Sequence, residues 1–425
     1  MRVAIVHDYL AQAGGAERVI EAMHDLWPEA PIYTSVYDSG ATLPSFKQMD
    51  IRTSFLQRFK IARQAKTHKF MLPFFPAAFE HFDMRGYDVV VSNTTSFAKG
   101  VITDPETCHI CYCHTPARFA WRYHEYVSQG NFGIRTRRVL PFLVHYLRNW
   151  DLAAAGRVDY FLANSYNIAG RVQKFYNRTS DVLYPPVETA RFHLVPNPTE
   201  DYLLVVSRLL PYKRVDLAIE ACNKLKVKLK VAGGGPDLAR LRALAGPTVE
   251  VLGRVPDGQI EGLFANCRAF LFPGEEDFGI APLEASACGR PVIAYRAGGA
   301  METVVDGKTG LFFDTPTVEA LCNAISRLDA QNFDPQAIRS HAEKFDVKAF
   351  QARLQSLVEI RVAEHRMRYA RLKPDADKVG RALLPLSLPG DADLYGVGTA
   401  GHGANGNGHA AVPYSVPAAE DKQVG

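Results

Sequence analysis

Short apolar runs alternate along most of the chain with polar turns and amphipathic stretches. The runs cover residues 3–6, 87–91, 159–165, 202–206, 229–232, 249–252, 270–272, 291–294 and 310–313. Runs of this length are typical of strands buried on both faces. Between the first two, Val19, Ile20, Met23 and Leu26 recur at helical spacing on one side of a helix. This alternation predicts an α/β protein with doubly wound parallel sheets.

The alternation falls into two series. The predicted parts are an N-terminal domain at 1–186, a linker at 187–201, a second domain at 202–345, a helix at 346–373 and a tail at 374–425. Pro196-Asn197-Pro198 marks the linker. The helix would start at Asp346, turn Phe350, Leu354, Leu357 and Ile360 inward, and return to the first domain. The tail is rich in Gly, Ala and Asn and is predicted to be disordered.

Composition excludes several classes of protein. The chain has 425 residues, 47% of them hydrophobic and 22% charged, which is enough for two domains with sizeable cores. A net charge of +4 is too small to indicate nucleic-acid binding. The N-terminus enters a strand directly, without a signal peptide, and no apolar run is long enough to span a bilayer. Seven cysteines, an odd number, argue against a disulfide framework. We therefore expect a cytoplasmic protein.

The segment 270–289, FLFPGEEDFGIAPLEASACG, combines a strand, a loop and a short helix. Pro282 suits the first turn of that helix, and Gly289 suits its end. Glu276 lies in the loop and Glu284 in the helix. The free N–H groups of Gly279, Ile280 and Ala281 would open the helix, where anions and hydroxyl oxygens bind. A loop with both amides and carboxylates can hold a polyol beside a phosphate; the alternative is an ordinary loop with solvated acids.

Each series begins with a strand and a turn suited to phosphate. The first turn carries Gly14 and Gly15 after Asp8, and it lacks the G-x-G-x-x-G spacing of dinucleotide-binding folds. The first turn of the second series carries Arg208 and Lys213, cations that can stabilise a leaving diphosphate. Arg214 could replace Lys213 in this role, although Lys213 is preferred.

The segment CHICYCH, residues 108–114, contains several metal-ligand side chains. On a strand Cys108 and Cys111 point to opposite faces, so we expect buried thiols and no zinc site there. His114 ends this strand, at the edge that faces the cleft in open α/β sheets. It either faces a ligand in that cleft or is a histidine satisfied by backbone.

Three further segments allow two interpretations each. The basic amphipathic stretch 55–70 fits an anionic membrane surface or a solvated helix. Arg118 and Trp121, followed by Arg122, Tyr123 and Glu125, fit an acceptor pocket or a helix core. The arginines at 361–371 fit anionic lipid or solvent.

The spacing of Glu276 and Glu284, within FPGEEDFGIAPLEASACGRPVIA and followed by Gly298-Gly299, resembles the E-x7-E signature of retaining glycosyltransferases of family 4. The resemblance covers about residues 1–372 and implies the GT-B fold, two Rossmann-like domains facing a cleft. It implies that the domain at 1–186 binds the acceptor and the domain at 202–345 binds the nucleotide-sugar donor. It also implies roles for individual residues. Sugar hydroxyls would contact Glu276, Gly279, Ile280 and His114, and the ribose would contact Glu284. The diphosphate would bind Arg208 and Lys213, with Gly14 and Gly15 lying over it. The base would contact Val255. Phe278 would belong to the same donor-binding loop, and Asp8, Arg118 and Trp121 to the acceptor side.

The wider pattern, including VHDYL, GGAER and CHTPARFAW, resembles bacterial mannosyltransferases of O-antigen and exopolysaccharide assembly. The resemblance implies transfer of mannose from GDP-mannose to a lipid-linked oligosaccharide, at the inner face of the plasma membrane. Without Asp-x-Asp in the folded region, no metal or other cofactor is expected. Two alternatives stay open: a UDP-sugar-dependent transferase with another acceptor, and a catalytically silent nucleotide-sugar-binding subunit.

Overall fold

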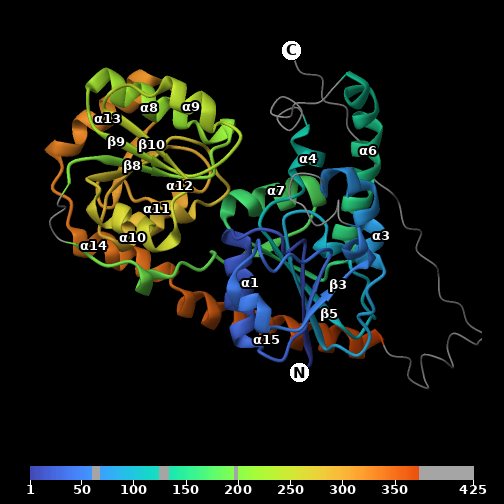
Figure 1. Ribbon diagram of the computed structural model, residues 1–425. Coiled ribbons are helices and arrows are strands. Elements are labelled where there is room, and N and C mark those ends of the chain that lie inside the picture. The colour runs from blue at the N-terminus through green and yellow to red at the C-terminus, as the bar shows by residue number, and fades with distance from the viewer. Residues whose placement is uncertain (60–67, 124–133, 196–199, 373–425) are drawn as a thin grey trace, which may run out of the picture. The chain divides into compact units, whose positions relative to one another are not determined.

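The computed structural model describes residues 1–59, 68–123, 134–195 and 200–372. Its first sheet has seven parallel strands in the order β3-β2-β1-β4-β5-β6-β7 (Figure 1). They are β1 (Val3–His7), β2 (Ile32–Thr34), β3 (Ile51–Thr53), β4 (Val89–Thr94), β5 (Cys108–Cys113), β6 (Tyr160–Ala163) and β7 (Ser180–Val182). The central strands are buried throughout, which explains their uninterrupted apolar pattern.

The helices connected to this sheet are mostly amphipathic. They are α1 (Gly15–Leu26), α3 (Phe75–Glu80), α4 (Arg118–Trp121), α6 (Ile134–Arg157) and α7 (Tyr166–Tyr176). The predicted inward side of α1 is confirmed, since Val19, Ile20 and Met23 are fully buried and Leu26 packs against the same core. Ser165 caps α7 by accepting a hydrogen bond from the N–H of Ile168.

The second sheet has six parallel strands in the order β10-β9-β8-β11-β12-β13. They are β8 (Leu203–Val206), β9 (Leu229–Ala232), β10 (Val249–Gly253), β11 (Ala269–Phe272), β12 (Val292–Tyr295) and β13 (Gly310–Phe313). Its helices are α8 (Val215–Leu225), α9 (Leu238–Leu244), α10 (Asp257–Asn266), α11 (Ile280–Ala287), α12 (Ala300–Thr303), α13 (Val318–Arg327) and α14 (Pro335–Ala342). The predicted doubly wound α/β architecture is confirmed for both sheets.

Both sheets change winding direction after their first strand. In the first sheet β1 lies between β2 and β4, and in the second β8 lies between β9 and β11. At such a switch point the loops after the two neighbouring strands diverge, and ligands of open α/β sheets bind there. The loops concerned are 8–14 and 95–98 in the first sheet, and 207–213 and 273–279 in the second.

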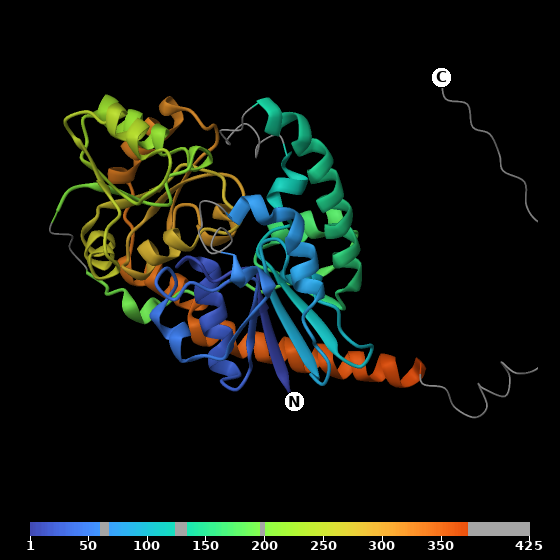
Figure 2. The same ribbon diagram turned by 45° about the vertical axis from the view of Figure 1, so that its right-hand side comes forward.

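The last helix, α15 (Val347–Leu372), returns to the first sheet, as predicted. It runs beside α1 in both views (Figures 1 and 2). Phe350, Leu354 and Leu357 are buried in the core of the first sheet. The prediction for Ile360 was wrong, because this side chain is 48% exposed. Six residues after Leu354, position 360 lies about 120° around the helix from it, and Val358 and Val362 occupy the inward side instead.

Some predictions fall outside the described residues. These are the middle of the basic stretch (60–67), Glu125, Pro196-Asn197-Pro198 in the linker, and the tail at 374–425. At the start of the basic stretch, residues Phe55–Arg58 form a single 3-10 turn capped by Ser54. Within the described ranges, every helix is too short or too polar to cross a membrane.

Candidate functional site

A cavity of about 510 Å³ lies between the carboxyl edges of the two sheets. The first sheet and its helices contribute Gly14, Gly15, Arg18, His114, Arg118 and Asn164 to its lining. The second contributes Arg208, Tyr212, Lys213, Val255, Ile260, Glu276, Asp277, Phe278, Gly279, Ile280 and Glu284. The fold thus gathers residues far apart in the chain around one volume large enough for a nucleotide sugar.

The glycine turn of the first sheet lies directly against the signature helix of the second. α1 begins at Gly15, with Gly14 in extended conformation as its N-cap. A Cβ atom on Gly15 would stand 2.9 Å from the Cδ1 of Ile280. A side chain at position 15 would therefore require the flexible end of Ile280 to shift, and free N–H groups of both helix ends border the cavity.

The Glu276 loop is held in place by glycines on its neighbours. Gly279 is the N-cap of α11, and its φ of +93° is a backbone conformation that residues with side chains rarely adopt. Gly299 donates its N–H to the carbonyl of Glu276 at 2.8 Å. A Cβ atom on Gly298 would lie 2.2 Å from that same carbonyl oxygen. The Gly-Gly pair that follows the E-x7-E motif thus positions the first glutamate.

The predicted cations and the first glutamate meet in the cavity. Lys213 Nζ forms an ion pair with the carboxylate of Glu276, and both side chains are largely buried. Arg208 lines the same cavity, is exposed, and has no ion-pair partner among the described residues. Arg214 points elsewhere: it pairs with Asp216 at 3.3 Å and lies outside the cavity lining. The geometry therefore favours Lys213 over Arg214 as the second cation facing a ligand.

His114 directly follows β5, at the edge where it was expected. Its Nε2 lies 2.5 Å from the Oδ1 of Asn93. An amide oxygen only accepts hydrogen bonds, so Nε2 carries the proton and Nδ1 is left as an acceptor. Burial, and then the neighbouring His7, lower the pKa of His114 to about 4. His114 is therefore neutral at pH 7 and can bind a hydroxyl group without adding charge.

An ion cluster, absent from the sequence predictions, fastens the two halves of the site together. Asp277, next to Glu276, accepts hydrogen bonds from Arg118 and, at 2.6 Å, from Arg171. The Arg118 guanidinium also lies over the ring of Tyr212, 5.3 Å from its centroid. Burial alone would raise the pKa of Asp277, but Arg118 and Arg171 together hold it below its usual value. We call Asp277, Arg118 and Arg171 the Asp277 clamp.

Two residues predicted on the acceptor side lie outside the cavity lining. The carboxylate of Asp8 is buried and accepts from the backbone N–H groups of residues 95–98, at 2.6 to 3.0 Å. Trp121 stacks on Phe175 at 4.8 Å and donates to Asp151 at 2.7 Å. Asp8 thus holds a loop, and Trp121 packs against α7. Arg118 does line the cavity, as part of the clamp.

The sequence predictions also missed a helix cap between the sheets. The carboxylate of Glu302 accepts from the N–H groups of Tyr166 at 2.8 Å and Asn167 at 3.1 Å, at the start of α7. An acidic residue is favourable at a helix N-terminus, but nothing local in sequence pairs positions so far apart. For Asp277 a signal existed, since it lies inside the E-x7-E motif.

Comparison with known protein families gives a match for the segment that contains the second sheet. The family model "Glycosyl transferases group 1" matches residues 186–345, which include Arg208, Lys213, Glu276 and Glu284. Residues 186–345 are therefore similar to a group 1 glycosyltransferase domain, and we call them the glycosyltransferase domain. The glycosyltransferase domain therefore supplies most of the cavity's charged side chains, and the first sheet supplies the opposite wall.

Curated relatives match part of this chain over part of their own length. A GDP-mannose-dependent alpha-(1-6)-phosphatidylinositol monomannoside mannosyltransferase of Mycolicibacterium smegmatis is 36% identical over 144 residues, 30% of this chain and 38% of that protein. The alpha-1,3/1,6-mannosyltransferase ALG2 of Dictyostelium discoideum is 38% identical over 110 residues, 24% of this chain and 26% of that protein. The chain thus spans well under half the length of either relative.

Solved structures extend the likeness beyond the glycosyltransferase domain to both sheets. Anabaena HepE in complex with UDP superposes with a TM-score of 0.61, covering 84% of this chain and 100% of HepE at 17% identity. At this identity the likeness concerns the fold, which is GT-B: two Rossmann-like domains and a last helix that returns to the first. The resemblance to family 4 glycosyltransferases, including bacterial mannosyltransferases, is supported by these relatives.

Proposed function

We propose that this protein is a retaining glycosyltransferase that transfers mannose from GDP-mannose to a lipid-linked oligosaccharide in bacterial surface polysaccharide synthesis. The observation that carries the proposal is the convergence of Arg208, Lys213, Glu276 and Glu284 on one cavity, within the glycosyltransferase domain. The choice of mannose rests on the activities for which both relatives are named, and the choice of GDP on the name of the mycobacterial relative.

The donor diphosphate would lie between Arg208, Lys213 and the N-terminus of α11. As the bond to the sugar breaks, negative charge develops on the leaving phosphate, and two cations and free N–H groups stabilise it. Lys213 already pairs with Glu276. A bound phosphate would therefore draw Lys213 towards itself and free Glu276 for sugar hydroxyls, coupling the two halves of donor recognition.

The sugar would lie between Glu276 and the neutral His114, with the amides of Gly279 and Ile280 beside it. In the proposed front-face mechanism, the acceptor hydroxyl attacks the anomeric carbon from the side of the departing phosphate. That phosphate oxygen takes the hydroxyl proton, so the anomeric configuration is retained and no carboxylate nucleophile is needed. Glu284, in the middle of α11, would hold the ribose hydroxyls, and Val255 would contact the base.

The acceptor half of the proposal is supported by an apolar stripe on α6. Val139, Phe142 and Tyr146 follow each other at helical spacing and are strongly exposed, Phe142 to 78%. Such a stripe suits the interfacial region of a lipid bilayer, where a lipid-linked acceptor is presented. Sedimentation with phosphatidylglycerol vesicles checks this contact: Phe142→Ser should release the protein into the supernatant. Equal sedimentation of both proteins would remove the stripe from the proposal.

The donor assignment is tested by thermal shift of the full chain with GDP, UDP, ADP and their sugars. A ligand that binds only the folded state at 100 times its Kd stabilises it by about 2.7 kcal/mol. We expect a selective rise with GDP and GDP-mannose, and a smaller rise in Arg208→Ala, because that variant lacks one phosphate contact. Transfer assays with GDP-mannose and lipid-linked acceptors then follow.

Other outcomes discriminate between the alternatives. A rise selective for UDP or its sugars would retain the fold and the chemistry but exclude GDP-mannose. A donor-selective rise without sugar transfer to any acceptor would favour a silent nucleotide-sugar-binding subunit. No response to any nucleotide would overturn the assignment of the cavity.

A further inference from the structure

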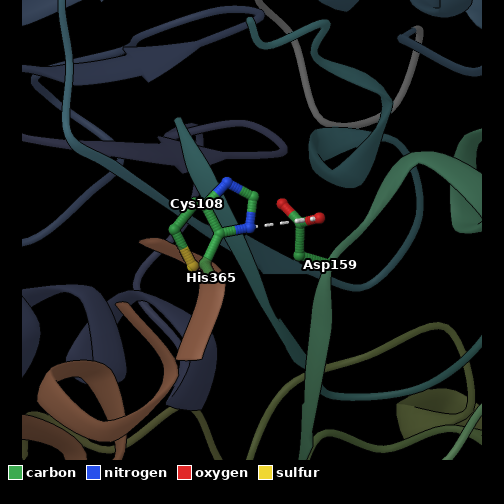
Figure 3. A group of neighbouring side chains, drawn as sticks. All are labelled: Cys108, Asp159 and His365. Atoms are coloured by element: carbon green, nitrogen blue, oxygen red, sulfur yellow. Dashed lines mark ion pairs between the residues drawn. The ribbon is translucent and has the colours of Figure 1, made fainter. Parts of the chain in front are cut away.

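Three potential metal ligands converge on the side of the first sheet remote from the cavity. Cys108 begins β5, Asp159 immediately precedes β6, and His365 lies on α15 (Figure 3). The Sγ of Cys108, a carboxylate oxygen of Asp159 and a ring nitrogen of His365 all lie within 4.8 Å of one another. The amino ends of parallel strands share one edge of the sheet, whereas the cavity borders the opposite, carboxyl edge.

The protonation of His365 follows from its partner on the other side of the ring. Its Nε2 lies 2.9 Å from the carbonyl oxygen of Pro105, which can only accept a hydrogen bond. Nε2 therefore carries the proton in either neutral or charged histidine. The other ring nitrogen, Nδ1, is buried and has no hydrogen-bond partner within the part of the chain that the structure describes. In the neutral ring Nδ1 carries a lone pair, and it faces the carboxylate of Asp159 (Figure 3).

Asp159 is fixed in the same manner. Its Oδ2 accepts the backbone N–H of His109 at 2.9 Å, and its Oδ1 lies 3.6 Å from the Nδ1 of His365. That separation is too long for a hydrogen bond. Two ligands bound at about 2.0–2.1 Å to a tetrahedral zinc ion lie roughly 3.3 Å apart, close to the observed value. In both His365 and Asp159 one polar atom is hydrogen-bonded to backbone, as is common for metal ligands. The other polar atom, Nδ1 of His365 or Oδ1 of Asp159, faces its counterpart across the position where an ion would bind.

Cys108 completes the set of donors. Its side chain is 1% exposed, and burial, then Asp159, raise the pKa of the free thiol to about 12. A coordinated thiol is deprotonated by the metal itself. The neighbouring cations are engaged elsewhere, Arg361 with Asp181 and Glu364, and Arg366 with Asp88. The basic side chains of α15 therefore do not take the place of an ion.

We propose that Cys108, Asp159 and His365 bind a zinc ion, with water as the fourth ligand. Sulfur, nitrogen and oxygen donors together suit zinc better than magnesium or calcium, which prefer oxygen alone. The bound ion would fasten α15 to the first sheet, where Val358 and Val362 already pack. Because the site lies at the edge opposite the cavity, its role is stability and not sugar transfer.

The sequence argument against zinc considered the cysteines within residues 108–114. It could not detect a group that joins Cys108 to Asp159 and His365. Cys108 packs in one core cluster, whereas Cys111 and Cys113 pack in another on the opposite face, as predicted. The partners of Cys108 are brought to it by the sheet order and the returning helix. Neither is visible in the spacing of residues 108–114.

Cobalt substitution tests the proposal on the full-length chain. After removal of metal with a chelator, we expect one equivalent of Co²⁺ to produce a thiolate-to-cobalt charge-transfer band, which Zn²⁺ then abolishes. Zn²⁺ should also raise the unfolding temperature by roughly 5 °C. Both responses should disappear in Cys108→Ser and in His365→Gln, whose amide can still donate to Pro105. They should persist in Cys111→Ser, a buried cysteine on the opposite face of the same strand.

Two results would overturn the proposal. The first is a wild-type protein without the charge-transfer band, which would leave the group as a His365–Asp159 ion pair beside a thiol. This result needs no variant and therefore holds even if a substitution prevents folding. The second is cobalt binding that survives in Cys108→Ser or His365→Gln, which would place the metal elsewhere.

Discussion

The two sheets share one strand order but use their switch points differently. In the first sheet, the space between the ends of β1 and β4 is filled by the carboxylate of Asp8, which is buried under the N–H groups of residues 95–98. In the second sheet, the loops after β8 and β11 leave Arg208 and the Lys213–Glu276 pair lining the cavity.

This difference shows that topology supplies a place for a ligand but does not decide its use. At the first switch point the carboxylate of Asp8 accepts from the converging N–H groups and so holds the loop 95–98 in place. At the second, a cation and a carboxylate neutralise each other across the opening, and a ligand with complementary charges can exchange with either. Substitutions at the two points should therefore affect different properties.

The largest effect is expected at the first switch point, on stability. Asp8→Asn replaces an acceptor oxygen with an NH₂ group that faces backbone donors, and should lower the free energy of unfolding by about 3 kcal/mol. Urea denaturation followed by tryptophan fluorescence measures this loss. Asp38→Asn is the matched control, because the hydrogen bond described for the Asp38 carboxylate is local, from the N–H of Gly40 at 3.0 Å. A midpoint unchanged from wild type in Asp8→Asn would show that the loop is held by other contacts.

At the second switch point the expected effect is on turnover. Lys213→Ala should reduce kcat/KM at least tenfold, since it removes a charge that stabilises the leaving phosphate, while the protein stays folded. Arg214→Ala, one residue further on, pairs outside the cavity and should leave turnover nearly unchanged. Equal losses in both variants would mean that the cavity does not distinguish these cations, and the role given to Lys213 would be withdrawn.

A smaller effect is expected where the two halves join, and it depends on pH. The folded-state pKa of Asp277 is lowered by the arginines, so the Asp277 clamp stabilises the protein above the unfolded pKa near 3.9 and loses this contribution as pH falls through the folded value. Arg118 is 39% exposed, so solvent screening limits the contribution to about 1 kcal/mol at pH 7.

Denaturation of Asp277→Asn at two pH values measures this contribution. The variant should be less stable than wild type at pH 7, and the difference should shrink as the pH falls below the unfolded pKa of the carboxyl group. Glu275→Gln is the comparison variant: its 42% exposed carboxylate pairs with Arg171 at 3.4 Å, so its loss at pH 7 should be smaller than that of Asp277→Asn. A stability difference that stays constant with pH would assign the effect of Asp277 to packing and not to its charge.

The fold and much of the cavity follow from local sequence patterns. Buried strands show as apolar runs, and the E-x7-E motif with its glycines marks the loop after β11. Gly15 and His114 could be placed because each directly follows a predicted strand or turn. Arg208 and Lys213 could be placed by the same reasoning about strand ends.

Contacts between distant segments could not be predicted in this way. Whether Asp8 faces a ligand or a loop depends on where residues 95–98 turn, which is a property of the sheet order. Arg118 looked like an acceptor contact because its partner, Asp277, lies in the other half of the protein. The prediction for Ile360 failed because it continued the inward side of α15 three residues beyond Leu357. In the structure Val358 and Val362 face the sheet instead.

The returning helix has a consequence for biosynthesis. Phe350, Leu354, Val358 and Val362 belong to the core that Val3, Ile5 and Val91 begin. A ribosome makes the strands of the first sheet early, yet their apolar surface stays partly uncovered until the whole second sheet has been translated. While the second sheet is being translated, the incomplete core of the first half is therefore open to misfolding and to chaperone binding. The glycosyltransferase domain, by contrast, can complete its own core as soon as it has been translated.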